Sequence, residues 1–201
     1  MASGSDSECY SLSEEKDLDY QGGPARPGTL IYAIRKDAPE EDLLLLLDEG
    51  ADVNMIENEH DKHCESSTAL EWVAPEGRFY RYALKWIILA GANIDRKDNP
   101  ESTALTAASE FPGELCAEKN VRTLVIYGAD VNHCDFYDRT ALIAAAVNGR
   151  NGNTEKTTRF LLDSGASVHV ASWRGTILMR VTSPASKTTE NTLKMLIEGD
   201  F

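Results

Sequence analysis

The sequence Gly-Ala-Asp-Val-Asn at residues 128–132, followed by Thr-Ala-Leu-Ile-Ala-Ala at residues 140–145, is the clearest sign of the fold because both motifs recur along the chain. The glycine motif begins at Gly50, Gly91, Gly128 and Gly165, at intervals of 41, 37 and 37 residues. The threonine motif begins at Thr68, Thr103, Thr140 and Thr176, at intervals of 35, 37 and 36, with an earlier echo at Gly28-Thr29-Leu30. Two motifs in register at one shared period indicate a repeat protein.

Each unit is predicted to contain a short helix rich in alanine and then a longer apolar helix. A threonine such as Thr140 can accept hydrogen bonds from backbone N–H groups at the start of a helix. Gly128 and Gly165 can adopt the left-handed conformation that ends a helix. In the second unit the apolar positions have helical spacing and predict one buried face made of Phe79, Tyr82, Ala83, Trp86, Ile87 and Ala90. Helices as short as the first one in each unit are marginal alone, so the units must stack.

The Thr-Ala-Leu-x-x-Ala opening, the apolar second helix and the Gly-Ala-Asp-Val-Asn ending together resemble the ankyrin repeat, at five places between residues 28 and 201. The resemblance implies an all-α solenoid of about five helix-turn-helix repeats joined by projecting finger loops. The expected units are approximately 28–58, 59–97, 98–134, 135–170 and 171–201. The resemblance also implies a non-catalytic scaffold that binds proteins through its fingers and its concave helix face.

Composition and charge exclude several other classes of protein. The chain of 201 residues has 42% hydrophobic residues, and its longest aliphatic run, Leu43 to Leu47, is far too short to span a membrane. A net charge of -13 argues against nucleic acid as a ligand and favours a basic protein segment as the partner. No secretory signal is evident and the four cysteines lack paired spacing, so we expect free thiols and a cytoplasmic or nuclear protein.

Residues 1–27 form an acidic segment in front of the repeats, with six acidic and two basic residues. Little of this segment is apolar, so we expect a mobile tail. The outward position of the second helices is occupied by Leu44, Lys85, Arg122, Arg159 and Lys194. A solvated helix face explains the four basic residues, whereas an exposed Leu44 suggests that the tail folds back on its helix.

The connectors between the two helices of a unit are longer than an ankyrin unit allows, especially at residues 109–117, 147–154 and 182–189. Insertions at equivalent places emerge on one face of a solenoid, so they offer a second binding edge. Tolerated variation in loop length is the favoured explanation, because long surface loops cost little free energy.

No catalytic or cofactor-binding arrangement is recognisable, so we expect no enzyme and no cofactor. The histidines fall in finger loops, away from any Ser-His-acid arrangement. His60, His63 and Cys64 in the first finger are three potential zinc ligands, but the second pair that a zinc site normally needs is missing. An exposed polar loop is the favoured interpretation, and a metal-dependent activity is the least favoured one.

The recognition surface is predicted from the family's variable finger and inner-helix positions. The best candidates for partner binding are Glu65, Trp72, Pro100, Phe136, Tyr137, Arg139, Trp173 and Arg174. Aromatic residues and arginine dominate binding energy at protein interfaces, which singles out Phe136, Tyr137 and Arg139. Phe136 and Tyr137 are consecutive, so at least one of them is expected to point outward, whereas Trp173 is equally suited to packing between fingers.

The favoured function is therefore a protein-interaction scaffold. Its first finger carries four acidic residues against one lysine, and its last finger carries Arg174 and no acid. A partner lying along the groove is expected to be basic near the first finger, and its binding is expected to weaken with salt. The alternative is that these repeats are the regulatory segment of a larger enzyme or signalling protein.

Overall fold

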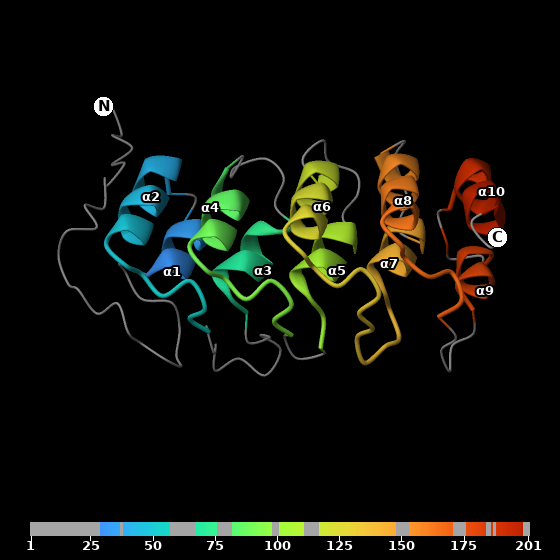
Figure 1. Ribbon diagram of the computed structural model, residues 1–201, viewed down its shortest axis with the longest axis horizontal. Helices are drawn as coiled ribbons and strands as arrows, with labels where there is room; N and C mark the ends of the chain where they lie inside the picture. Colours follow the sequence, from blue (N-terminus) through green and yellow to red (C-terminus); the bar gives the residue numbers. More distant parts are fainter. Residues whose placement is uncertain are drawn as a thin grey trace, which may run out of the picture.

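Ten helices form five consecutive pairs within the described part of the chain, and the pairs stack side by side (Figure 1). The computed structural model describes residues 29–36, 38–56, 67–75, 82–97, 101–110, 117–147, 153–170, 176–183, 186 and 188–198. The helices are α1 (Leu30–Arg35), α2 (Glu40–Asp48), α3 (Ala69–Val73), α4 (Ala83–Leu89), α5 (Ala104–Glu110), α6 (Ala117–Ile126), α7 (Ala141–Val147), α8 (Asn153–Asp163), α9 (Ile177–Val181) and α10 (Glu190–Glu198). The odd-numbered helices form an inner row, the even-numbered helices form an outer row, and the finger loops project beyond the inner row. This is the all-α solenoid that the repeats predict.

The repeated threonine and glycine residues define where helices begin and end. Thr29 Oγ1 accepts a hydrogen bond from the Tyr32 backbone N–H at 3.2 Å, and Thr68 forms a capping box with Glu71 at the start of α3. At the end of α6, Gly128 has a φ of +97°. The next amide, that of Ala129, then donates to the Leu124 carbonyl at 3.0 Å and closes the helix.

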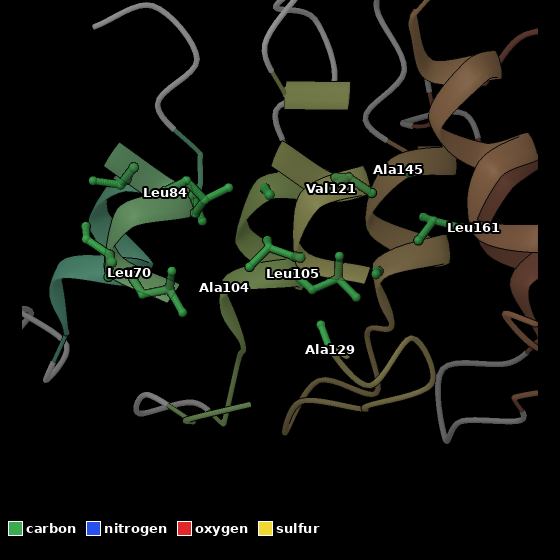
Figure 2. Close-up of a cluster of buried hydrophobic side chains, with 14 of the residues drawn as sticks. Leu70, Leu84, Ala104, Leu105, Val121, Ala129, Ala145 and Leu161 are labelled. Atoms are coloured by element: carbon green, nitrogen blue, oxygen red, sulfur yellow. The ribbon is translucent and has the colours of Figure 1, made fainter. Parts of the chain in front are cut away.

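One continuous apolar core runs through the stack between the two rows of helices (Figure 2). Leu70, Leu105 and Leu142 come from successive inner helices and are at most 1% exposed. Leu124 and Leu161 from successive outer helices are fully buried. Burying one such leucine contributes about 1.5–3 kcal/mol, so each helix depends on the repeats beside it for its stability.

The helix face predicted for the second unit is wrong in part. Ala83 and Ile87 are buried as expected, but Tyr82 is 51% exposed and Leu84, which the pattern omitted, is buried. The helix begins only at Ala83, so Tyr82 precedes the helical face that packs on the core.

The most exposed leucine of α2 is Leu45, one position after the Leu44 that was predicted to face outward. Leu43 and Leu46 are buried, Leu44 is only partly exposed, and Leu45 is 51% exposed. A helix turns by about 100° per residue, so a shift of one position changes which leucine faces outward. The tail proposed to cover Leu44 lies outside the described residues.

Asparagine side chains connect neighbouring fingers. Asn132 Nδ2 donates to the Gly165 carbonyl at 3.1 Å, and Asn132 Oδ1 accepts from the Ser167 backbone N–H at 2.8 Å. Asn54 makes the same two bonds to Gly91 and Asn93. The asparagine that ends the repeated glycine motif therefore links one finger to the next.

No helix in the described residues is long and apolar enough to cross a membrane. The long loops between residues 109–117 and 147–154 lie mostly outside the described residues, as do His60, His63 and Cys64. In the described part of the chain, no three His, Cys, Asp or Glu side chains are grouped so that they could hold a metal ion.

Candidate functional site

The third finger, residues 129–140 between α6 and α7, is organised by the buried side chain of Asp135. Asp135 is 4% exposed, and its Oδ1 accepts hydrogen bonds from the backbone N–H groups of Tyr137 and Arg139, both at 2.8 Å. Its Oδ2 accepts from Arg139 Nε at 2.7 Å. The Asp138 N–H donates to the Asp135 carbonyl at 2.9 Å, which closes a tight turn. Aspartate at the first position of a turn bonds forward to the backbone in this way, so the tip has a defined shape.

Phe136 and Tyr137 occupy the two central positions of this turn. Phe136 is 61% exposed and Tyr137 is 44% exposed. The prediction that at least one ring would point outward assumed an extended backbone, in which neighbouring side chains alternate. A turn does not alternate in this way, and both rings are presented to solvent.

Arg139 is held inside the finger instead of projecting from it. Its guanidinium pairs with Asp135 and with Glu110 at the end of α5, and it lies 5.5 Å from the centre of the Tyr137 ring. Burial works against the charge, but the hydrogen bond to Asp135 and the charge of Glu110 outweigh it and raise the pKa of Arg139. Arg139 therefore stays charged and positions the turn and the Tyr137 ring.

Neighbouring repeats hold the third finger on both sides. His133 Nε2 lies 2.7 Å from the carbonyl oxygen of Glu101 in the second finger. Arg180 Nη1, from α9 of the last repeat, donates to the Asp138 carbonyl at 3.2 Å. The tip is thus fixed relative to the repeats before and after it.

Cys134 is a free thiol at the base of the same turn. Burial and the nearby carboxylates of Asp138, Asp135 and Asp130 raise the pKa of Cys134. The thiol therefore stays protonated near neutral pH, which lowers its reactivity as a nucleophile.

Of the other predicted recognition residues, only Trp72 lies in the described part of the chain, and it is not at this tip. Trp72 is 37% exposed on the inner helix α3, where the Arg35 guanidinium lies 5.3 Å from the centre of its ring. Helix α3 belongs to the second repeat and lies apart from the third finger, which joins α6 to α7 (Figure 1). Glu65, Pro100, Trp173 and Arg174 lie outside the described residues.

Three residues that support the tip were missed at the sequence level. The spacing of Asp135 and Arg139, four residues apart across a turn, was a local signal that could have identified the aspartate. Glu110 and Arg180 carried no such signal, because they are 29 residues before Arg139 and 42 residues after Asp138. Only the stacking of the repeats brings them to the third finger.

Comparisons with known proteins agree with the architecture. A family model described as ankyrin repeats (3 copies) matches residues 70–172. The fold is similar to the crystal structure of an ankyrin repeat domain from Acinetobacter baumannii AYE, with a TM-score of 0.74 and 25% sequence identity. That similarity covers 94% of this chain and 88% of the other. A search of curated proteins found no significant match. The family model matches more than half of the 201 residues of this chain, so the chain belongs to the ankyrin repeat family.

Proposed function

We propose that this chain is a non-enzymatic protein-interaction module that binds a partner protein through the tip of its third finger and the adjoining concave face. Ankyrin repeats are in general protein–protein interaction modules. The observation that carries the proposal is the pair of consecutive exposed aromatic rings, Phe136 and Tyr137, on a turn fixed by Asp135.

The fixed turn makes the two rings suitable anchors for binding. Ordering a flexible side chain or loop at an interface costs about 0.5–1.5 kcal/mol for each immobilised side chain. Asp135, Arg139 and the contacts from Glu101 and Arg180 already restrain this backbone. More of the free energy from burying the two rings is then available for binding.

The charge around the tip supports a partner segment with basic residues. The chain carries a net charge of -13. Arg139 is already paired with Asp135 and Glu110, and Arg180 donates to the Asp138 carbonyl. Carboxylates in this part of the finger therefore favour lysine or arginine beside the apolar group that covers the rings.

The proposal is tested by affinity capture with the full chain and the double variant Phe136→Ala/Tyr137→Ala. A control variant, Leu89→Ala/Ile126→Ala, removes two exposed apolar side chains from the ends of outer helices, where they are 63% and 75% exposed. Proteins that bind the third finger should be lost with the fingertip variant and retained with the control. The melting temperature of both variants should match that of the parent chain.

Equal recovery of every captured protein by the fingertip variant would overturn the assignment of this site. A captured partner is then measured at increasing salt, where a basic segment is expected to bind more weakly. The screening length falls from about 30 Å at 0.01 M to about 10 Å at 0.1 M salt. Affinity that does not change with salt would contradict the basic character of the partner while leaving the aromatic site in place.

A further inference from the structure

A groove between the outer helices α4 and α6 combines open volume with positive charge. The groove has a volume of about 490 Å³, and its lining includes the cations Lys85, Lys119 and Arg122. Leu84 contributes a buried apolar surface and Tyr82 a ring that is 51% exposed. No carboxylate is among the described residues that line it.

The cations of this groove are largely free to bind a ligand. Among the described residues, neither Lys85 nor Lys119 has an ion-pair partner. Arg122 pairs with Glu118 at 3.0 Å, and its guanidinium stacks 4.3 Å from the centre of the Phe160 ring in the next repeat. Stacking holds the planar guanidinium in place, which favours the paired hydrogen bonds that arginine makes with carboxylates.

A second groove, between α8 and α10, shows that this charge is not a general property of the outer row. Its volume is about 380 Å³, and its three cations, Lys156, Arg159 and Lys194, are accompanied by the carboxylates of Glu155 and Glu198. Lys194 is also paired with Glu190 at 3.0 Å. The two grooves have similar basic residues. Among the described residues, however, only the groove between α4 and α6 has no acidic residue in its lining.

We propose that the groove between α4 and α6 is a second docking surface, which binds an extended Asp/Glu-rich segment of a partner protein. A solvated helix face accounts for basic residues at one position of each repeat, but it does not account for three cations around a groove with no acid among its described lining residues. The adjoining carboxylates of Glu118 and Glu40 are engaged by Arg122 and by the Tyr82 backbone N–H, which leaves Lys85 and Lys119 as the cations available to a ligand. In a chain of net charge -13, cations gathered in a concavity attract carboxylates locally while the rest of the surface repels them. The surface is independent of the third finger and has the opposite charge preference.

The test uses the full chain and a fluorescein-labelled deca-glutamate peptide, with binding followed by fluorescence anisotropy at about 0.01 M salt. The groove variant is Lys85→Glu/Lys119→Glu. The matched control is Lys156→Glu/Lys194→Glu, which makes the same change in net charge on the other groove. The groove variant is expected to bind the peptide about tenfold more weakly, equivalent to about 1.4 kcal/mol, and the control less than about twofold more weakly.

Several outcomes would overturn the proposal. Equal weakening in both variants would show that the peptide responds only to overall charge, and no binding to the parent chain would remove the site. Tighter binding of a deca-thymidine oligonucleotide than of the peptide would assign the groove to nucleic acid. Tighter binding of a peptide of residues 1–27, lost in the groove variant, would make the chain's own acidic segment the occupant. Loss of the fingertip partner in Phe136→Ala/Tyr137→Ala is a separate result and leaves this proposal unaffected.

Discussion

The second and third fingers begin with the same backbone but are linked to their neighbours differently. Gly91 and Gly128 end the preceding helices with φ values of +98° and +97°. In the third finger, Asn132 both donates and accepts a hydrogen bond across to the next repeat. In the second finger the equivalent residue is Asp95, which only accepts, from the Asp130 backbone N–H at 2.9 Å. A carboxylate has no proton to donate, so the second link is half made.

This contrast shows that the glycine motif and the individual side chains have different structural roles. The glycine motif sets the course of the backbone in every repeat. The residue at the end of the motif, and those that follow it in the finger, set how firmly each finger is held. The third finger combines the complete asparagine link with the Asp135 turn, which explains why it can present two aromatic rings in a fixed position.

Asp135→Ala should produce the largest loss of stability, because it removes the buried carboxylate that organises the third finger. The substitution deletes three hydrogen bonds to a buried carboxylate and leaves Arg139 with Glu110 as its carboxylate partner. We expect the free energy of unfolding to fall by about 2–3 kcal/mol, measured by urea denaturation. Hydrogen exchange at the amides of Tyr137 and Arg139 should become faster.

Asp130→Ala is the control, because Asp130 Oδ1 is exposed and accepts from the Asn132 N–H at 2.9 Å. Its effect should remain below about 1 kcal/mol. Equal losses in the two variants would show that the buried Asp135 turn is no more important than an ordinary surface turn.

Asn132→Asp should convert the complete link of the third finger into the half-made link of the second. The donor to the Gly165 carbonyl is lost, and a carboxylate oxygen then faces that carbonyl. The free energy of unfolding should fall by about 1–1.5 kcal/mol in urea denaturation. Asn54→Asp makes the same change at Gly91 and should have a similar effect, so a loss at only one of the two sites would contradict the shared role.

Thr157→Val extends the comparison of complete and incomplete polar contacts to the outer helices. Thr157 is 1% exposed, and its Oγ1 makes no hydrogen bond to any described residue. Valine has nearly the same shape without the buried hydroxyl, so we expect a gain of about 1 kcal/mol in thermal or urea unfolding. Thr192→Val is the control, because Thr192 Oγ1 lies 3.0 Å from Thr189 Oγ1, and it should not be stabilising.

Asp95→Asn should have the smallest effect and the opposite sign to Asn132→Asp. The new amide can keep the bond from Asp130 N–H and also donate to the Gly128 carbonyl, as Asn54 and Asn132 do at their own sites. We expect a gain of about 0.5–1 kcal/mol in the free energy of unfolding. An unchanged or lower value would mean that the geometry of the second link differs from the other two.

Much of the fold was predictable because its signals are local. Thr29 and Thr68 cap helices, and Gly128 adopts the left-handed conformation, as the motif predicts. The exact helix faces were less predictable: Leu45 is more exposed than Leu44, and Leu84 is buried where Tyr82 was expected. A shift of one residue at a helix start rotates the whole face by about 100°, and caps do not define that start so closely.

The candidate site was predictable only in its aromatic residues. Phe136 and Tyr137 were identified because they lie between two structural motifs at positions that the repeat pattern does not constrain, and both are exposed. Arg139 was grouped with them because arginine is common at interfaces. The structure instead uses its guanidinium within the molecule, through a carboxylate that lies 29 residues earlier in the chain.

The period, the order of the helices and the family could all be read from the amino-acid sequence, because caps, turns and helical periodicity act over a few residues and repeat every 35–41 positions. Which polar side chains have partners and which are available to a ligand depends on how the repeats pack against one another. Stacking brings together residues from different repeats. It places Glu110 and Arg180 against the third finger, and Lys85 and Lys119 in the lining of one groove. Binding surfaces depend on these contacts between repeats, and the contacts cannot be inferred from the spacing of residues along the chain.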